Sequence, residues 1–74
     1  MSTVRKRSVS LSGHRTSYSV EDEFLEILKS MAEAKSIPLA RLISQIDSGR
    51  ARETNLSSAL RLAVLAHLKS VHTH

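Results

Sequence analysis

Cysteine is absent from this chain of 74 residues, and aromatic side chains are almost absent. Without cysteine, neither a disulfide framework nor a thiolate metal site can support a small core. No apolar run approaches the roughly 18 residues of a membrane-spanning helix, and the basic N-terminus leads into serines rather than into a signal peptide. We therefore expect a cytoplasmic protein with no membrane partner. A chain of this length forms one domain at most, and oligomerisation is the usual remaining way to complete such a small core.

The charge is unevenly placed along the chain. Residues 1–20 carry a net charge of +4, whereas residues 21–35 carry −3. Residues 36–54 and 55–74 carry +1 and +2. A cationic leading segment on a nearly neutral body suits a polyanionic partner, and a solubilising arm is the alternative interpretation.

Residues 15–20 alternate strictly in character and lead without a loop into an acidic helix start, which predicts a β-strand. The unpaired N–H and C=O groups of a lone strand need a neighbour, and the same strand in a second copy of the chain is the obvious one. The two predicted faces are Thr16, Tyr18 and Val20 on one side and Arg15, Ser17 and Ser19 on the other.

The residues upstream of this strand leave its partner open. Val9 and Leu11 have odd numbers, whereas the apolar face of the strand has even numbers, so one straight strand cannot carry both sets on one face. A two-residue turn at Gly13-His14, with glycine at the positive-φ position of a type II′ turn, resolves the conflict. A glycine bulge or a simple end of structure at Gly13 is the alternative. The hairpin would pair Leu11 with Thr16 and Val9 with Tyr18.

Helical periodicity predicts three helices, over residues 21–35, 38–46 and 55–70. Ser19 is the candidate N-cap of the first, Pro38 suits the first turn of the second, and Asn55 is a good N-cap for the third. The polar run 47–50 reads as the end of the second helix. The predicted buried positions are Phe24, Ile27, Leu28, Met31 and Ala32 in the first helix, Leu39, Leu42, Ile43 and Ile46 in the second, and Leu56, Leu60, Val64 and Leu68 in the third.

Two leucines extend the apolar arc of the third helix. Leu62 and Leu65 lie well round its side, and a helix apolar over so wide an arc usually contacts more than one neighbour. A second protomer would explain them, and partly exposed leucines are the alternative.

The order of short strand, helix, tight break and helix over residues 15–46 resembles the ribbon-helix-helix family of DNA-binding proteins. Val20-Glu21-Asp22-Glu23-Phe24 is similar to the family's junction of apolar residue, proline, two acids and apolar residue, with Glu21 in place of proline. Leu42-Ile43 stands where the second helix of the family has paired aliphatics. The Gly-His-Arg-Thr-Ser run at 13–17 resembles a branch of short bacterial proteins, and that resemblance covers residues 5 to about 70.

The resemblance implies a mostly α fold with a short β-ribbon, assembled as an intertwined homodimer with an additional C-terminal helix. We expect residues 1–12 to be a basic arm or outer strand, residues 13–70 the domain, and residues 71–74 a tail. Residues 55–60 also resemble the capped start of the family's second helix, but the strand–helix–break–helix order favours residues from Pro38 onward for that element.

The resemblance also implies a transcriptional regulator of double-stranded DNA, in which a two-stranded antiparallel ribbon enters the major groove. Serine discriminates poorly between bases, so two serines among three base-reading positions predict modest specificity. The expected base contacts are Arg15, Ser17 and Ser19. The expected contacts to the DNA backbone are Arg5, Lys6, Arg7, His14, Leu39 and Ala40. The expected dimer core is Tyr18, Val20, Phe24, Leu28, Leu42, Ile43 and Ile46.

This chain departs from the family in the turn between its helices. Family members tend to have glycine in that turn and a serine or threonine cap, where this chain has Ser36 and Pro38. Because proline lacks an N–H, the phosphate contact at the second helix would fall to Leu39 and Ala40.

Other functions find less support in the sequence. Acids in a first helical turn stabilise the helix dipole, and no nucleophile elbow or phosphate-binding glycine loop is present, so we expect no enzyme and no cofactor. The four histidines lack completing ligands for a metal site. Arg50, Arg52 and Arg61 form either a second basic patch or a solvated surface. A dimeric protein-interaction module that binds a partner through helix 55–70 is the main alternative function. An antitoxin is the third, which the short tail after Ser70 disfavours.

Overall fold

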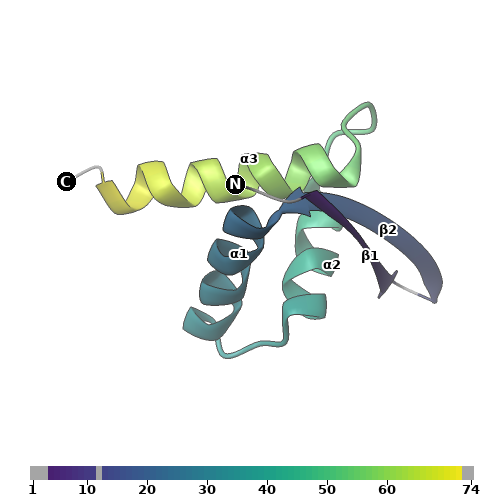
Figure 1. Ribbon diagram of the computed structural model, residues 1–74, viewed down its shortest axis with the longest axis horizontal. Coiled ribbons are helices and arrows are strands. Elements are labelled where there is room, and N and C mark those ends of the chain that lie inside the picture. The colour runs from purple at the N-terminus through teal and green to yellow at the C-terminus, as the bar shows by residue number, and fades with distance from the viewer. Residues whose placement is uncertain (1–3, 12, 73–74) are drawn as a thin grey trace.

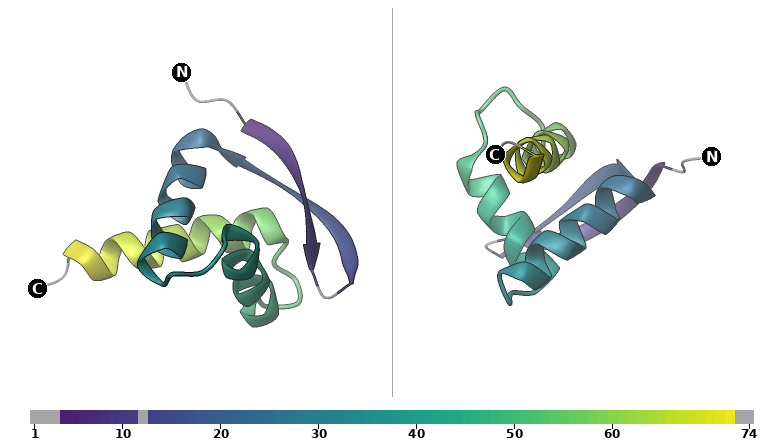
Figure 2. Two further views of the ribbon diagram at one scale, coloured as in Figure 1. Left: turned by 90° about the horizontal axis from the view of Figure 1, so that it is seen from below. Right: turned by 90° about the vertical axis from the view of Figure 1, so that its left-hand side faces the viewer.

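The computed structural model describes residues 4–11 and 13–72 of the chain. Within them, a β-hairpin precedes three helices, and α3 lies across one end of the α1–α2 pair with the hairpin to one side (Figures 1 and 2). The elements are β1 (Val4–Leu11), β2 (His14–Glu21), α1 (Asp22–Ala34), α2 (Leu39–Gly49) and α3 (Leu56–His72). The predicted class, mostly helical with a short β-ribbon, is confirmed for the single chain.

The hairpin is present, but its predicted register is wrong. Val9 lies opposite Thr16 and Leu11 lies opposite His14. Gly13 has a φ of 82°, and His14 begins β2 instead of lying in the turn. Moving one strand by two residues keeps every side chain on the same face, so the apolar pattern could not distinguish the two registers. The predicted inward face of β2 is confirmed, with Tyr18 and Val20 buried.

Helix α1 has the predicted extent to within a residue, but its predicted cap is wrong. Glu21 is the N-cap residue and makes no side-chain cap hydrogen bond, whereas Ser19 lies within β2. At the other end, the Ser36 N–H donates to the Glu33 carbonyl and the Ile37 N–H donates to the Ala32 carbonyl, each at 3.0 Å. This is a Schellman motif. Ser36 has a φ of 56°, so a serine adopts the left-handed conformation that favours glycine.

Helices α2 and α3 both run further than the sequence predicts. Pro38 is the N-cap of α2, which ends at Gly49, three residues past the predicted end at Ile46 but within the polar run 47–50 predicted to stop it. One serine and one glycine in a last turn cost little helix stability. The predicted cap of α3 is confirmed, since the Ser58 N–H donates to Asn55 Oδ1 at 2.8 Å. Helix α3 extends two residues past the predicted end at Ser70.

One hydrophobic core joins the hairpin to all three helices. Its stripe on α1 differs from the prediction, because Leu25 is buried whereas Phe24, Ile27 and Met31 are only partly buried. Helix α1 touches α2, α3 and β2 on different sides, so its covered arc is wider than a single stripe. The buried residues that make up this one cluster are Leu11, Tyr18, Val20, Leu25, Leu28, Ala32, Leu42, Ile43, Leu56, Leu60 and Val64.

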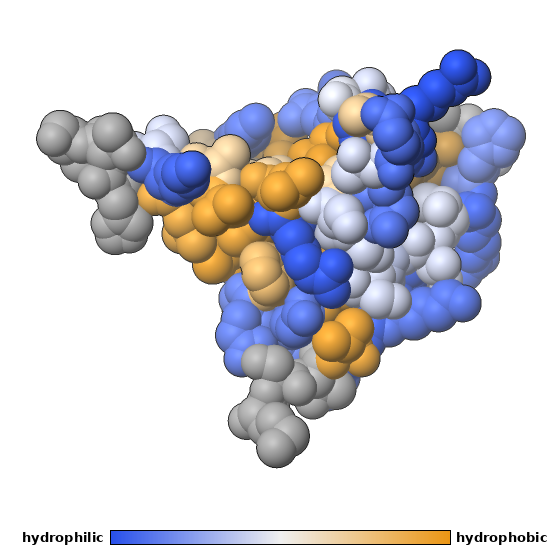
Figure 3. All heavy atoms as spheres, turned by 90° about the horizontal axis from the view of Figure 1, so that it is seen from above, coloured by the Kyte–Doolittle hydropathy of each residue, from blue (hydrophilic) through white to orange (hydrophobic). Residues whose placement is uncertain are grey.

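Several large apolar side chains lie outside this core. Leu62 is 57% exposed and Leu65 is 50% exposed, both on α3, and Leu62 borders a hollow that is also lined by Gln45 and Ile46 of α2. Hydrophobic side chains gather over the α3 side of the molecule in Figure 3. Val4 and Val71 are also about half exposed.

Candidate nucleic-acid interface

The hairpin has two chemically different faces. Residues directly opposite one another in an antiparallel pair project to the same face. The inner face packs on the helices through Leu11, Tyr18 and Val20. The outer face is mostly polar, and the three of its four pairs that lie nearer the turn are Lys6 with Ser19, Ser8 with Ser17, and Ser10 with Arg15.

The predicted base contacts lie together on this outer face. Arg15 and Ser17 are exposed, and Ser19 is half-buried. Strand β1 adds Lys6, Ser8 and Ser10, all exposed, to the same face. Of these, Ser8 and Ser10 were not singled out from the sequence, because their place depends on a pairing that the sequence left open.

Three of the predicted backbone contacts, Arg5, Lys6 and Arg7, lie on different faces. Arg5 and Arg7 pair with Val20 and Tyr18, and therefore lie on the inner side of the hairpin. Both approach Asp22 at the start of α1, at 3.8 Å and 3.6 Å from its Oδ1 atom. Lys6 is therefore the only one of these cations on the face that carries Arg15. Exposed His14 begins β2 beside the turn.

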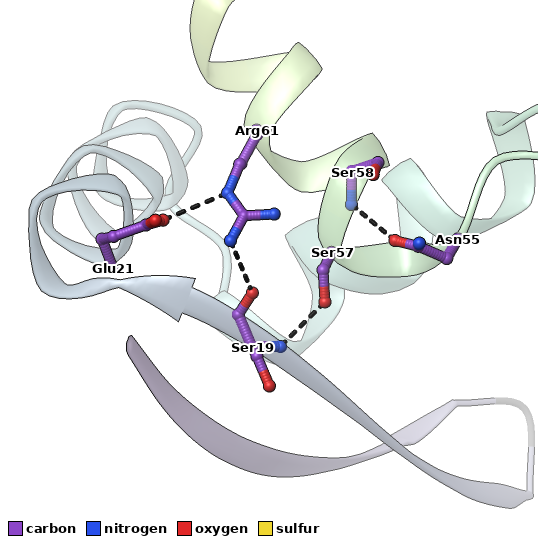
Figure 4. A network of polar contacts seen from close by, with 6 residues as sticks. All are labelled: Ser19, Glu21, Asn55, Ser57, Ser58 and Arg61. Carbon is purple, nitrogen blue, oxygen red and sulfur yellow. Dashed lines mark hydrogen bonds and ion pairs between the residues drawn. The ribbon is translucent and has the colours of Figure 1, made fainter. Parts of the chain in front are cut away.

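Helix α3 holds the end of β2 that leads into α1 (Figure 4). The Ser19 N–H donates to Ser57 Oγ at 2.8 Å, and Arg61 Nη2 donates to the Ser19 carbonyl at 3.2 Å. Arg61 Nε also donates to Glu21 Oε1 at 3.1 Å, and the guanidinium carbon lies 5.9 Å from the centroid of the Phe24 ring. The sequence offered no signal for this network, which joins residues about 40 positions apart.

Arg50 and Arg61, two of the three arginines considered for a second basic patch, are held in separate hydrogen-bond networks. Arg61 is bound to β2 and to Glu21, whereas Arg50 donates to Asp47 Oδ1 at 2.7 Å and to the Thr54 carbonyl at 2.6 Å. For Arg50, the geometry favours the solvated surface over a second basic patch, because both of its bonds lie within residues 47–54.

The start of α2 has backbone donors that no described residue binds. Pro38 is the N-cap and provides no side-chain cap, so the first two helical N–H groups, of Leu39 and Ala40, are available to an anion. Leu39 is half-buried and Ala40 is exposed. This helix start lies at the end of the molecule opposite α3 (Figure 1).

A model of the ribbon-helix-helix domain family matches residues 4–68. The chain belongs to the ribbon-helix-helix family. The match covers β1, β2, α1, α2 and most of α3. No curated protein and no solved structure matches the chain.

Membership in the ribbon-helix-helix family gives the coarse function. Proteins of this family typically dimerise, bind DNA and regulate, and the family is generally without catalysis. No helix in the described part of the chain is long and apolar enough to cross a membrane. Among residues 4–11 and 13–72, no group of three or more histidine and acidic side chains could hold a metal ion.

The residues predicted as the ribbon-helix-helix dimer core already build the core of one chain. Burial raises the pKa of Tyr18, an effect that the nearby Arg7 charge partly opposes. Phe24 and Ile46 are only partly buried within the chain, so part of their apolar surface remains available to a second copy. The fully buried members of the set are Val20, Leu28, Leu42 and Ile43.

Proposed function

We propose that this ribbon-helix-helix protein is a homodimeric transcriptional regulator that presents the outer face of its hairpin to the major groove of DNA. The observation that carries the proposal is the chemistry of that face. It is polar and basic, with Arg15 and Lys6 exposed on neighbouring strands, while the apolar residues of β2 are turned into the core. Arginine can bind guanine through two hydrogen bonds, so Arg15 is the residue proposed to read bases.

The width of the sheet decides how it meets the groove. Two copies paired through β2 would form a sheet of four strands, with outer backbones roughly 14 Å apart at about 4.8 Å per strand. The major groove is only about 12 Å wide. We therefore propose that the two central β2 strands enter the groove, while the outer β1 strands lie over its walls. Lys6 then meets phosphate, and Arg15 and Ser17 meet base edges.

Selection from a random duplex pool at about 150 mM salt tests this proposal. Enrichment of repeated half-sites is expected, because a symmetric dimer reads both halves of a site. Replacing Arg15 by alanine should cost about 1–3 kcal/mol of specific binding. Replacing Lys6 by alanine should weaken binding to all duplexes and reduce the salt slope by about one.

Lys29→Ala is the matched control for these variants. Lys29 is exposed on α1, so its removal takes away one positive charge without touching the hairpin. DNA retained without an enriched motif would contradict base reading, and no retained DNA would contradict the function as a whole.

A protein-interaction module is the second candidate, favoured by the exposed Leu62 and Leu65 on α3. Under that function, Arg15→Ala would leave partner binding unchanged, whereas Leu62→Asp would abolish it. An antitoxin would show both behaviours, because it joins DNA binding to a toxin partner.

A further inference from the structure

The outer edge of β2 is divided into two parts. The Ser19 N–H and C=O groups both bind α3, through Ser57 and Arg61, and therefore point away from β1 (Figure 4). In an antiparallel strand, alternate residues direct their backbone groups to the same side. The N–H and C=O groups of Arg15 and Ser17 therefore point to the same edge. We call these four groups the open edge, because no described residue hydrogen-bonds to them there.

Helix α3 supplies at Ser19 what a neighbouring strand would supply. An added strand would offer a carbonyl to the Ser19 N–H and an N–H to the Ser19 carbonyl. The Ser57 hydroxyl takes the first role at 2.8 Å, and the Arg61 guanidinium takes the second at 3.2 Å. A strand that pairs with β2 must either stop before Ser19 or displace these two bonds.

We infer that α3 fixes the register in which two copies of this chain pair through β2. The two-fold axis lies at Thr16, so that Arg15 of each copy faces Ser17 of the partner subunit. This inference rests on the homodimer of the proposed function, and it adds the alignment of the strands and the residues that determine it.

Three symmetric registers, with the two-fold axis at Arg15, Thr16 or Ser17, bring the open edge to the centre of the interface. A two-fold axis at Ser17 would place Arg15 opposite Ser19 and would break both bonds to α3. An axis at Arg15 would set two arginines directly opposite one another, which is destabilising, and would place Ser17 opposite Gly13, where the chain turns with a φ of 82°.

The register with its axis at Thr16 avoids both costs. Each copy then uses the backbone groups of Arg15 and Ser17, and each arginine meets a serine rather than a like charge. Gly13 of the partner subunit would lie opposite Ser19, so the partner's strand reverses where α3 closes the edge. The length of the open edge thus matches the length of the strand that covers it.

Single cysteines test the register directly, because the chain has none of its own. The two Thr16 positions would form a non-hydrogen-bonded pair with Cα atoms about 4.5 Å apart, within disulfide range. The two Ser17 positions would lie roughly 8 Å apart, beyond that range. In a glutathione redox buffer without DNA, Thr16→Cys should form a covalent dimer at least about tenfold faster than Ser17→Cys.

Each other outcome overturns the inference. Faster dimer formation by Ser17→Cys would place the axis at Ser17. Faster formation by Ser8→Cys would mean that the copies pair through the outer edge of β1. No covalent dimer from any variant would mean that the axis lies at Arg15 or that the strands do not pair.

A second arm tests the role of α3. When Ser57→Ala is combined with each cysteine, the bond to the Ser19 N–H is lost, and the rate for Ser17→Cys should rise relative to that for Thr16→Cys. Circular dichroism at the assay temperature verifies that each variant is folded. An unchanged ratio in the folded variants would mean that α3 does not set the register.

The cross-linking result and the DNA result are independent. A Thr16→Cys dimer in a protein that fails to retain any duplex would leave this inference standing and remove the proposed function. A Ser17→Cys dimer in a protein that selects half-sites would do the reverse.

Discussion

The two ends of β2 differ in what holds them. The end that leads into α1 is held by α3, whose Ser57 and Arg61 bind the backbone of Ser19 and, through Arg61, the Glu21 carboxylate. At the end near the turn, Arg15 and Ser17 are exposed, and no described residue hydrogen-bonds to the open edge. One end of β2 is thus fixed by contacts within the chain, and the other end remains available to a binding partner.

The difference depends on the third helix. A ribbon followed by two helices would leave both ends of β2 equally free along this edge. Here α3 packs on the core through Leu60 and Val64 and carries its polar residues, Ser57 and Arg61, to the strand. The comparison therefore predicts that disturbing α3 changes the held end first.

The largest effect is expected from Leu60→Ala. Leu60 is fully buried, so the truncation removes apolar contacts and leaves a cavity, which typically costs about 2–5 kcal/mol. Such a loss is a large part of the total stability of a small domain. Urea denaturation followed by circular dichroism measures it.

Leu62→Ala is the matched control for that measurement. Leu62 lies on the same helix and is 57% exposed, so its truncation should change the unfolding free energy by less than about 0.5 kcal/mol. Equal losses of unfolding free energy in the two variants would mean that α3 is not anchored in the core. The third helix would then not explain why the two ends of β2 differ.

A smaller effect is expected from Ser57→Ala, which removes the acceptor of the Ser19 N–H. A hydrogen bond of this kind contributes about 1 kcal/mol. Amide hydrogen exchange at Ser19 should quicken, while exchange within α3 stays slow. Ser58→Ala is the control, because the Ser58 backbone N–H, not its hydroxyl, binds Asn55. Equal exchange at Ser19 in both variants would mean that Ser57 does not hold the strand.

The elements of this fold could be predicted from the sequence because they depend on local patterns. Alternation gave the inner face of β2, helical spacing gave three helices, and the side chain of Asn55 gave the cap of α3. The left-handed conformation of Ser36 was not predictable in this way. A serine there carries no local signal, because the Schellman bonds that stabilise it are made to the backbone of α1.

The candidate site was predictable only in part. The alternation placed Arg15 and Ser17 on an outer face, but it could not set the hairpin register, since a shift of two residues preserves the faces. Arg61 looked like surface charge because its partners, Ser19 and Glu21, lie about 40 positions away. Long-range polar contacts of single side chains leave no periodic trace in a sequence.

The smallest effect is expected from Glu21→Gln, at the held end. A hydrogen bond from its own backbone N–H and then the bond from Arg61 lower the pKa of Glu21 below its usual value of 4.5. Because the folded state binds this proton less readily than the unfolded state, the carboxylate stabilises the fold above about pH 4.5, and this contribution is lost as the pH falls through the lowered pKa.

The wild-type chain should therefore be more stable than Glu21→Gln at pH 7, by a margin that shrinks toward pH 3. Urea midpoints at both values measure this, with Glu26→Gln, an exposed acid of α1, as control. A margin that stays the same at both values would mean that Arg61 binds the position regardless of its charge.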